Sequence, residues 1–161
     1  MDDALLCIPS SAQSRSNLRF RCIAGKNKIT GCFIDYSPTA DKNHPMCEWF
    51  RDEVARLEWR KERVLPDWAQ RIFSPSMVSA GNIQDPHELS QIRELAEKCV
   101  YNYTATVMET AGQCEDNTEQ QNYYAQNQKQ NPHTPKVMVS LGLSEEDVRV
   151  FIQDCLFPEI R

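Results

Sequence analysis

The chain has 161 residues, of which 40% are hydrophobic and 25% are charged, a composition typical of one globular domain and not of a disordered chain. Only 5 residues are glycine, which disfavours phosphate-binding glycine-rich loops. No apolar run is long enough to span a membrane, so we expect no membrane partner. The net charge of -5 is unequally divided, because residues 1–84 carry +2 and residues 85–161 carry -7.

The amino-terminal segment and the cysteines indicate the compartment. The chain begins Met1-Asp2-Asp3, and the apolar run that follows is too short for a signal peptide. Seven cysteines without tight spacing fit reduced thiols better than a disulfide framework. We therefore expect an intracellular, cytoplasmic protein, with residues 1–16 as a loose amino-terminal tail.

Residues 18–36 are predicted to form a β-hairpin. Antiparallel pairing about Asn27 places the apolar pairs on one side of the ribbon and leaves Lys26-Asn27-Lys28 as the loop. Because an isolated hairpin is marginal in water, it needs a third strand or a helix against it. The facing pairs of this register are Leu18–Tyr36, Phe20–Ile34, Cys22–Cys32, Arg19–Asp35, Arg21–Phe33 and Ile23–Gly31.

Two long helices are predicted over residues 45–65 and 86–111. Pro45 and Pro86 suit first-turn positions, Pro66 ends the first helix, and Gly112 ends the second. Each segment has apolar residues at helical spacing along one stripe. We expect the two stripes to pack as an antiparallel pair, with a homodimer seam along the second helix as the alternative.

The carboxy-terminal third is predicted to be less regular. Residues 113–135 contain six Gln and four Asn, which favours a flexible loop. Residues 136–141 have strand composition and are a possible third strand for the hairpin, and Ser144 caps a helix over 145–157. The predicted fold is therefore a single α+β domain over 1–161, mainly helical.

The favoured site lies on the polar side of the first long helix. Trp59 falls there at helical spacing, among three arginines, and Trp and Arg are enriched at interface hot spots. This set predicts a partner protein with an acidic and partly apolar surface. Its residues are Arg56, Trp59, Arg60 and Arg63.

A nucleic-acid interface is the first alternative. Residues 13–34 contain basic side chains and no acid, and a basic ribbon can follow a phosphate backbone. A sequence pI of about 5.2 opposes this interpretation. The candidate contacts are Arg15, Arg19, Arg21, Lys26 and Lys28.

A structural zinc site is the second alternative. Cys22 and Cys32 face each other in the hairpin register, and His44 and Cys47 begin the helix that follows. Four such ligands can close a tetrahedral site, but no paired-cysteine knuckle is present, and we favour the interpretation that these cysteines are buried as small hydrophobic residues. Apart from zinc, no cofactor is expected.

Catalytic residues are not assigned. Cys47 near a helix amino terminus, with His44 three residues before it, is the one candidate nucleophile, and nothing in the sequence completes an active site around it. We therefore favour a non-enzymatic protein–protein interaction module, a subunit or regulator of a larger intracellular assembly. A flexible segment before a short amphipathic helix fits this function, because such a helix can bind in a partner's groove.

Overall fold

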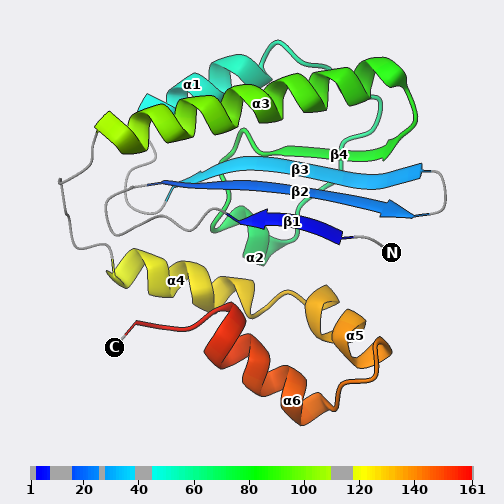
Figure 1. Ribbon diagram of the computed structural model, residues 1–161, viewed down its shortest axis with the longest axis vertical. Helices are drawn as coiled ribbons and strands as arrows, with labels where there is room; N and C mark the ends of the chain where they lie inside the picture. Colours follow the sequence, from blue (N-terminus) through cyan, green and yellow to red (C-terminus); the bar gives the residue numbers. More distant parts are fainter. Residues whose placement is uncertain (1–2, 8–15, 26–27, 39–44, 110–117, 161) are drawn as a thin grey trace.

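The computed structural model describes residues 3–7, 16–25, 28–38, 45–109 and 118–160. A four-stranded antiparallel sheet lies between two helical layers (Figure 1). The elements in chain order are β1 (Asp3–Cys7), β2 (Ser16–Gly25), β3 (Lys28–Pro38), α1 (Pro45–Val54), α2 (Asp67–Gln70), β4 (Val78–Ile83), α3 (Pro86–Glu109), α4 (Thr118–Gln128), α5 (His133–Ser140), α6 (Glu145–Val150) and the π-helical turn η1 (Phe151–Leu156). Helices α1 and α3 cover one face of the sheet, and α2 and α4–α6 lie on the other side. The predicted α+β class is confirmed.

The hairpin register is confirmed pair by pair. Phe20 faces Ile34, Cys22 faces Cys32, and Arg19 faces Asp35. The turn differs from the prediction: Lys28 already belongs to β3 and pairs with Gly25, and the register shifts by one residue between Ile23 and Ala24. The sheet order is β1-β2-β3-β4, so residues 3–7, expected in a loose tail, form an edge strand instead.

The core lies between the sheet and the pair α1/α3. Alternate residues of β2, β3 and β4 point to this side because side chains alternate along a strand. Tyr36 is fully buried at the centre, where its ring packs edge-on against Trp49 and Phe50 and its hydroxyl donates to the Cys99 carbonyl at 2.5 Å. The rest of the core contains Leu18, Cys32, Ile34, Met46, Cys47, Val78, Ala80, Ile83, Ile92, Leu95, Cys99 and Tyr103.

Helix α1 is half as long as predicted. It ends at Val54, where the last turn tightens and the Leu57 amide donates to the Val54 carbonyl at 2.9 Å. The next residues are extended, because Arg63 N donates to Ser79 O at 2.8 Å and Gly81 N donates to Lys61 O at 2.9 Å. Pairing with β4 therefore overrides the helical periodicity of residues 55–65. Helix α3 nearly matches the prediction and runs beside α1 in the opposite direction.

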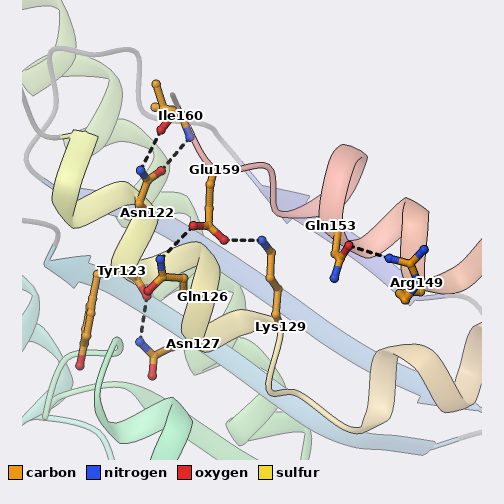
Figure 2. A network of polar contacts seen from close by, with 9 residues as sticks. All are labelled: Asn122, Tyr123, Gln126, Asn127, Lys129, Arg149, Gln153, Glu159 and Ile160. Carbon is orange, nitrogen blue, oxygen red and sulfur yellow. Dashed lines mark hydrogen bonds and ion pairs between the residues drawn. The ribbon is translucent and has the colours of Figure 1, made fainter.

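The Gln/Asn-rich segment is not a loop over its whole length, because residues 118–128 form α4. The amide side chains bind the carboxy-terminal segment (Figure 2). Asn122 Nδ2 donates to Ile160 O at 2.9 Å, and Ile160 N donates to Asn122 Oδ1 at 2.7 Å. Gln126 and Lys129 hold the two carboxylate oxygens of Glu159 at 2.9 and 2.6 Å, and these hydrogen bonds lower the pKa of that carboxyl.

The possible third strand over 136–141 is wrong, because these residues lie in α5. Val137 and Val139 have strand propensity, but that propensity depends on packing against a sheet, and both side chains are exposed here. Pro135 stands in the first turn of α5, where a missing amide is tolerated. The carboxy-terminal helix is confirmed as α6 and η1, and Ser144 caps it by accepting from Asp147 N at 3.1 Å.

Within the described ranges, no helix combines the length and apolar composition needed to cross a membrane.

The Asn122 contacts predict a stabilising role for amides in α4. Replacing Asn122 with Ala removes both hydrogen bonds to the Ile160 backbone and should lower the free energy of unfolding by about 1 kcal/mol in urea titrations. Gln130→Ala is the matched control, because its side chain has only a 3.5 Å contact with Asn127. Equal losses of unfolding free energy in Asn122→Ala and Gln130→Ala would contradict a specific role for Asn122.

Candidate functional site

The sheet face turned away from α1 and α3 carries an unusual set of side chains. The register places Arg21 opposite Phe33 and Phe33 opposite Ser79, and Arg63 continues this row through its backbone hydrogen bond to Ser79. Arg19 lies two residues from Arg21 on the same face of β2. We call this set the arginine face: Arg19, Arg21, Phe33, Arg63 and Ser79.

Two glycines let Arg63 lie flat on the sheet. Gly31 and Gly81 are register partners, and a Cβ atom on Gly31 would stand 2.8 Å from Arg63 Nη1. A Cβ atom on Gly81 would stand 3.0 Å from Arg63 Cγ. The Arg63 guanidinium carbon lies 5.6 Å from the centre of the Phe33 ring, at cation–π range. Small residues on two strands therefore provide the space that this long side chain occupies.

Arg19 joins the sheet to α4. Its guanidinium carbon lies 3.9 Å from the centre of the Tyr124 ring, and Tyr124 in turn packs edge-on against Phe73. The Arg19 Nε and Ser79 Oγ atoms are buried and have no hydrogen-bond partner among the described residues. Buried polar atoms without partners are costly, so both atoms lack the hydrogen bond that would offset their burial.

Asp35 is the buried acid beside this face. Ser37 Oγ donates to its Oδ2 at 2.7 Å, and Ser74 donates to it through Oγ at 2.5 Å and through its backbone amide at 3.2 Å. Burial raises the pKa of the Asp35 carboxyl to about 6, against the opposing effects of the Ser74 and Ser37 hydrogen bonds and of Arg19. The Ser74 hydrogen bonds to Asp35 fix the segment after α2 to the sheet. Because the Asp35 side chain is fully buried, its carboxyl group does not itself reach solvent.

The predicted partner-binding set does not lie on one helix face. Trp59 packs partly buried against the core, while Arg63 lies on the opposite side of the sheet. Arg56 is exposed and paired with Glu53 at 2.9 Å, and the Arg60 backbone amide donates to Glu88 at 2.8 Å. The early end of α1 separates these residues, since residues 61–63 are extended.

The predicted nucleic-acid set is only partly described. Arg19 and Arg21 lie on the same face of β2, both half-buried. Arg15 and Lys26 lie outside the described residues, and Lys28 is described only as the first residue of β3. The two described arginines face the α4 side of the sheet, so they do not form the open ribbon that the prediction assumed.

The predicted zinc set is likewise incomplete. Cys22 and Cys32 are adjacent on the α1/α3 face, and a hydrogen bond joins their thiols. Cys47 Sγ lies 3.7 Å from the Tyr36 carbonyl oxygen, and His44 lies outside the described residues. Burial raises the pKa of the Cys32 thiol to about 12. Among the described residues, no cluster of three or more His, Cys, Asp or Glu side chains has metal-binding geometry.

Several residues at or beside the arginine face were missed or assigned elsewhere. Tyr124 lies in the segment that was predicted to be a flexible loop, and Ser74 was assigned no role. Arg63 and Arg19 belonged to two separate predicted sites. The sequence signal was the alternation in 19–23 and 31–35, which put Arg19, Arg21, Phe33 and Asp35 on one side of the hairpin.

The comparisons with known proteins identify a relative of known structure. Neither the protein-family models nor the curated proteins give a match. The solved structure of PcyX matches with 31% sequence identity and a TM-score of 0.61, over 99% of this chain and 67% of PcyX. The chain belongs to the PcyX family. It spans about two thirds of the length of PcyX.

The raised pKa of Asp35 predicts how pH affects stability. Between about pH 4 and pH 6, the folded protein keeps a proton on Asp35 that the unfolded chain has lost, so this group's contribution to the free energy of unfolding decreases as pH rises. Asp35→Asn should remove that contribution. The difference in free energy of unfolding between Asp35→Asn and the unmodified protein, measured by urea titration at several pH values, should change across this window and stay constant above it.

Asp67→Asn serves as the control for a general charge effect, because Asp67 carries an exposed carboxyl at the start of α2. A constant difference between Asp35→Asn and the unmodified protein across the window would refute a raised pKa for Asp35.

Proposed function

We propose that the chain binds a small organic anion with an apolar or aromatic body on the arginine face. The observation that carries this proposal is the row Arg21–Phe33–Ser79–Arg63, an aromatic ring with a guanidinium on either side. Guanidinium groups recognise carboxylates and phosphates through paired hydrogen bonds, and a ring beside them favours an apolar body.

The arginine face carries positive charge that nearby acids do not neutralise, and this favours an anionic ligand. Neither Arg19 nor Arg63 forms an ion pair within 4 Å in the described part of the chain. The acid beside the face, Asp35, accepts hydrogen bonds from Ser37 and Ser74. The unpaired Arg19 Nε atom adds a donor. Because strands are spaced roughly 4.8 Å apart, the backbones of Arg21 and Arg63 are separated by about 14 Å, which suits an extended ligand with more than one anionic group.

The proposal assigns binding and no reaction. It replaces the expected partner protein, with its acidic and partly apolar surface, by a small anion, and it moves the contact from a helix surface to the sheet. The described cysteines Cys22, Cys32, Cys47, Cys99 and Cys155 are all free thiols, which supports the proposal that the protein acts in the reducing cytoplasm.

Protein–protein interaction without catalysis is the second candidate, as a subunit or regulator of an intracellular assembly. It is supported by the exposed apolar side chains around α5 and α6, because exposed apolar groups mark interaction surfaces. These side chains are Val137, Val139, Leu141, Leu143, Val150 and Phe151.

An Arg63 variant tests the proposed anion site. The dianionic aromatic dye bis-ANS is the probe, and the neutral dye Nile red reports apolar binding alone. Arg63→Gln should weaken bis-ANS binding by about tenfold or more, because a charge-assisted hydrogen bond contributes roughly 1.5–3 kcal/mol. The substitution leaves the backbone bond to Ser79 in place. Fluorescence titration at two salt concentrations measures both the affinity and its ionic component.

Arg93→Gln is the matched control, because Arg93 is an exposed arginine on α3. Binding of bis-ANS that responds equally to both substitutions, or that is independent of salt, would contradict the anion site. Nile red binding should be unchanged in both variants.

A further inference from the structure

Cys22 and Cys32 are the one pair of cysteines that face each other across strands in the described sheet. They are register partners on β2 and β3, and both side chains point to the α1/α3 face. The Cys32 thiol donates a hydrogen bond to the Cys22 sulfur. Two thiols in contact can be joined by a disulfide where the backbone holds them at a suitable separation.

The backbone separation at this pair suits a disulfide. Directly facing residues of antiparallel strands have Cα atoms about 4.5 or 5.5 Å apart, depending on their position in the ladder. Disulfides join cysteines whose Cα atoms are about 4.4–6.8 Å apart. The strands therefore need no change of register to form the bond. The other described cysteines, Cys47, Cys99 and Cys155, lie on helices and not in the sheet.

The two sulfurs differ in access and in acidity. Cys32 is fully buried, whereas Cys22 is only partly buried. Burial raises the pKa of both thiols, to about 12 for Cys32, but the hydrogen bond from Cys32 opposes this rise at Cys22. Because the thiolate is the attacking form, Cys22 is the sulfur that reacts first with an oxidant from solution. Cys32 is already in place for the second step.

We propose that Cys22 and Cys32 form a reversible disulfide, with oxidised glutathione as the oxidant. The Cys22 thiolate attacks one sulfur of oxidised glutathione, which gives a mixed disulfide and releases the first glutathione. Cys32 then loses its proton and attacks Cys22 Sγ, which releases the second glutathione. The two thiols are oxidised to one disulfide, and their two protons end on the two molecules of reduced glutathione.

The geometry makes this disulfide easy to reduce again. Facing Cβ atoms in a sheet are about 4.5–5.5 Å apart, whereas a disulfide holds them about 3.8 Å apart, so the bond draws the strands together. Strain of this kind makes a disulfide more reducible, which suits the transient disulfides of reducing compartments.

The disulfide also lies next to an irregularity of the hairpin. The register shifts between Ile23 and Ala24, directly after Cys22, and a register shift disrupts the ladder locally. A bond between Cys22 and Cys32 therefore fixes β2 to β3 where their backbone pairing weakens. Oxidation is expected to reduce opening of the hairpin at its turn end. This inference uses the face opposite the anion site and does not depend on that site.

Thiol trapping tests the proposal. The reduced, folded protein is equilibrated with excess oxidised glutathione, blocked with N-ethylmaleimide and digested with trypsin. Cleavage after Arg21, Lys26 and Lys28 separates the two cysteines, so the disulfide appears as a linked pair of peptides. Most chains of monomer mass should contain this pair, and millimolar reduced glutathione should remove it. Amide exchange at the turn end of β2 and β3 should be severalfold slower in the oxidised protein.

Cys155→Ser is the matched control, because Cys155 is exposed and lies outside the sheet. The linked peptides should form in this variant as in the unmodified protein, and should be absent in Cys22→Ser. The proposal is overturned if Cys22 stays reduced, stops at the mixed disulfide with glutathione, or links to a different cysteine. A link to Cys32 that forms only in urea, or that resists reduced glutathione, would also overturn it.

Discussion

Two consecutive residues of β3, Asp35 and Tyr36, hold both helical layers to the sheet. Their side chains point to opposite faces because side chains alternate along a strand. Tyr36 fixes α3 through its hydroxyl and α1 through its ring contacts with Trp49 and Phe50, and each such aromatic pair contributes about 0.5–1.5 kcal/mol beyond its buried area. Asp35 fixes the segment after α2 through Ser74.

The two faces of the sheet consequently have different chemistry. One is an aliphatic and aromatic core around Tyr36, and the other collects arginines beside an aromatic ring. The arginines come from distant parts of the chain: Arg19 and Arg21 from β2, and Arg63 from the extended segment that borders β4. Substitutions of these arginines therefore alter the charge of this face without disturbing the core on the other side.

The carboxy-terminal layer is held by polar contacts to an unusual degree. Helix α4 binds the last described residues through amide side chains, and only Val148 is buried in α6. The layer meets the sheet through Arg19 and Tyr124. Polar attachment of this kind is weaker per contact than a packed core, because each hydrogen bond replaces one to water.

The sequence by itself determined the α+β class, the hairpin register and the helices α3 and α6. Period-2 alternation over 18–36 admits one register that places Phe20, Cys22 and their partners on one face, and local capping signals at Pro86 and Ser144 define helix starts. These features depend on neighbours in sequence, so they can be derived from it.

Only the tertiary structure decided where α1 ends, that residues 137–139 are helical, and which arginines share a face of the sheet. The segment 61–63 left helical periodicity because β4 offered backbone hydrogen bonds, whereas Val137 and Val139 lie in helix α5 with exposed side chains. Strand pairing between residues far apart in the chain places Arg63 on the same face of the sheet as Arg19. Such pairings depend on which elements become adjacent, and local propensity carries no information about that.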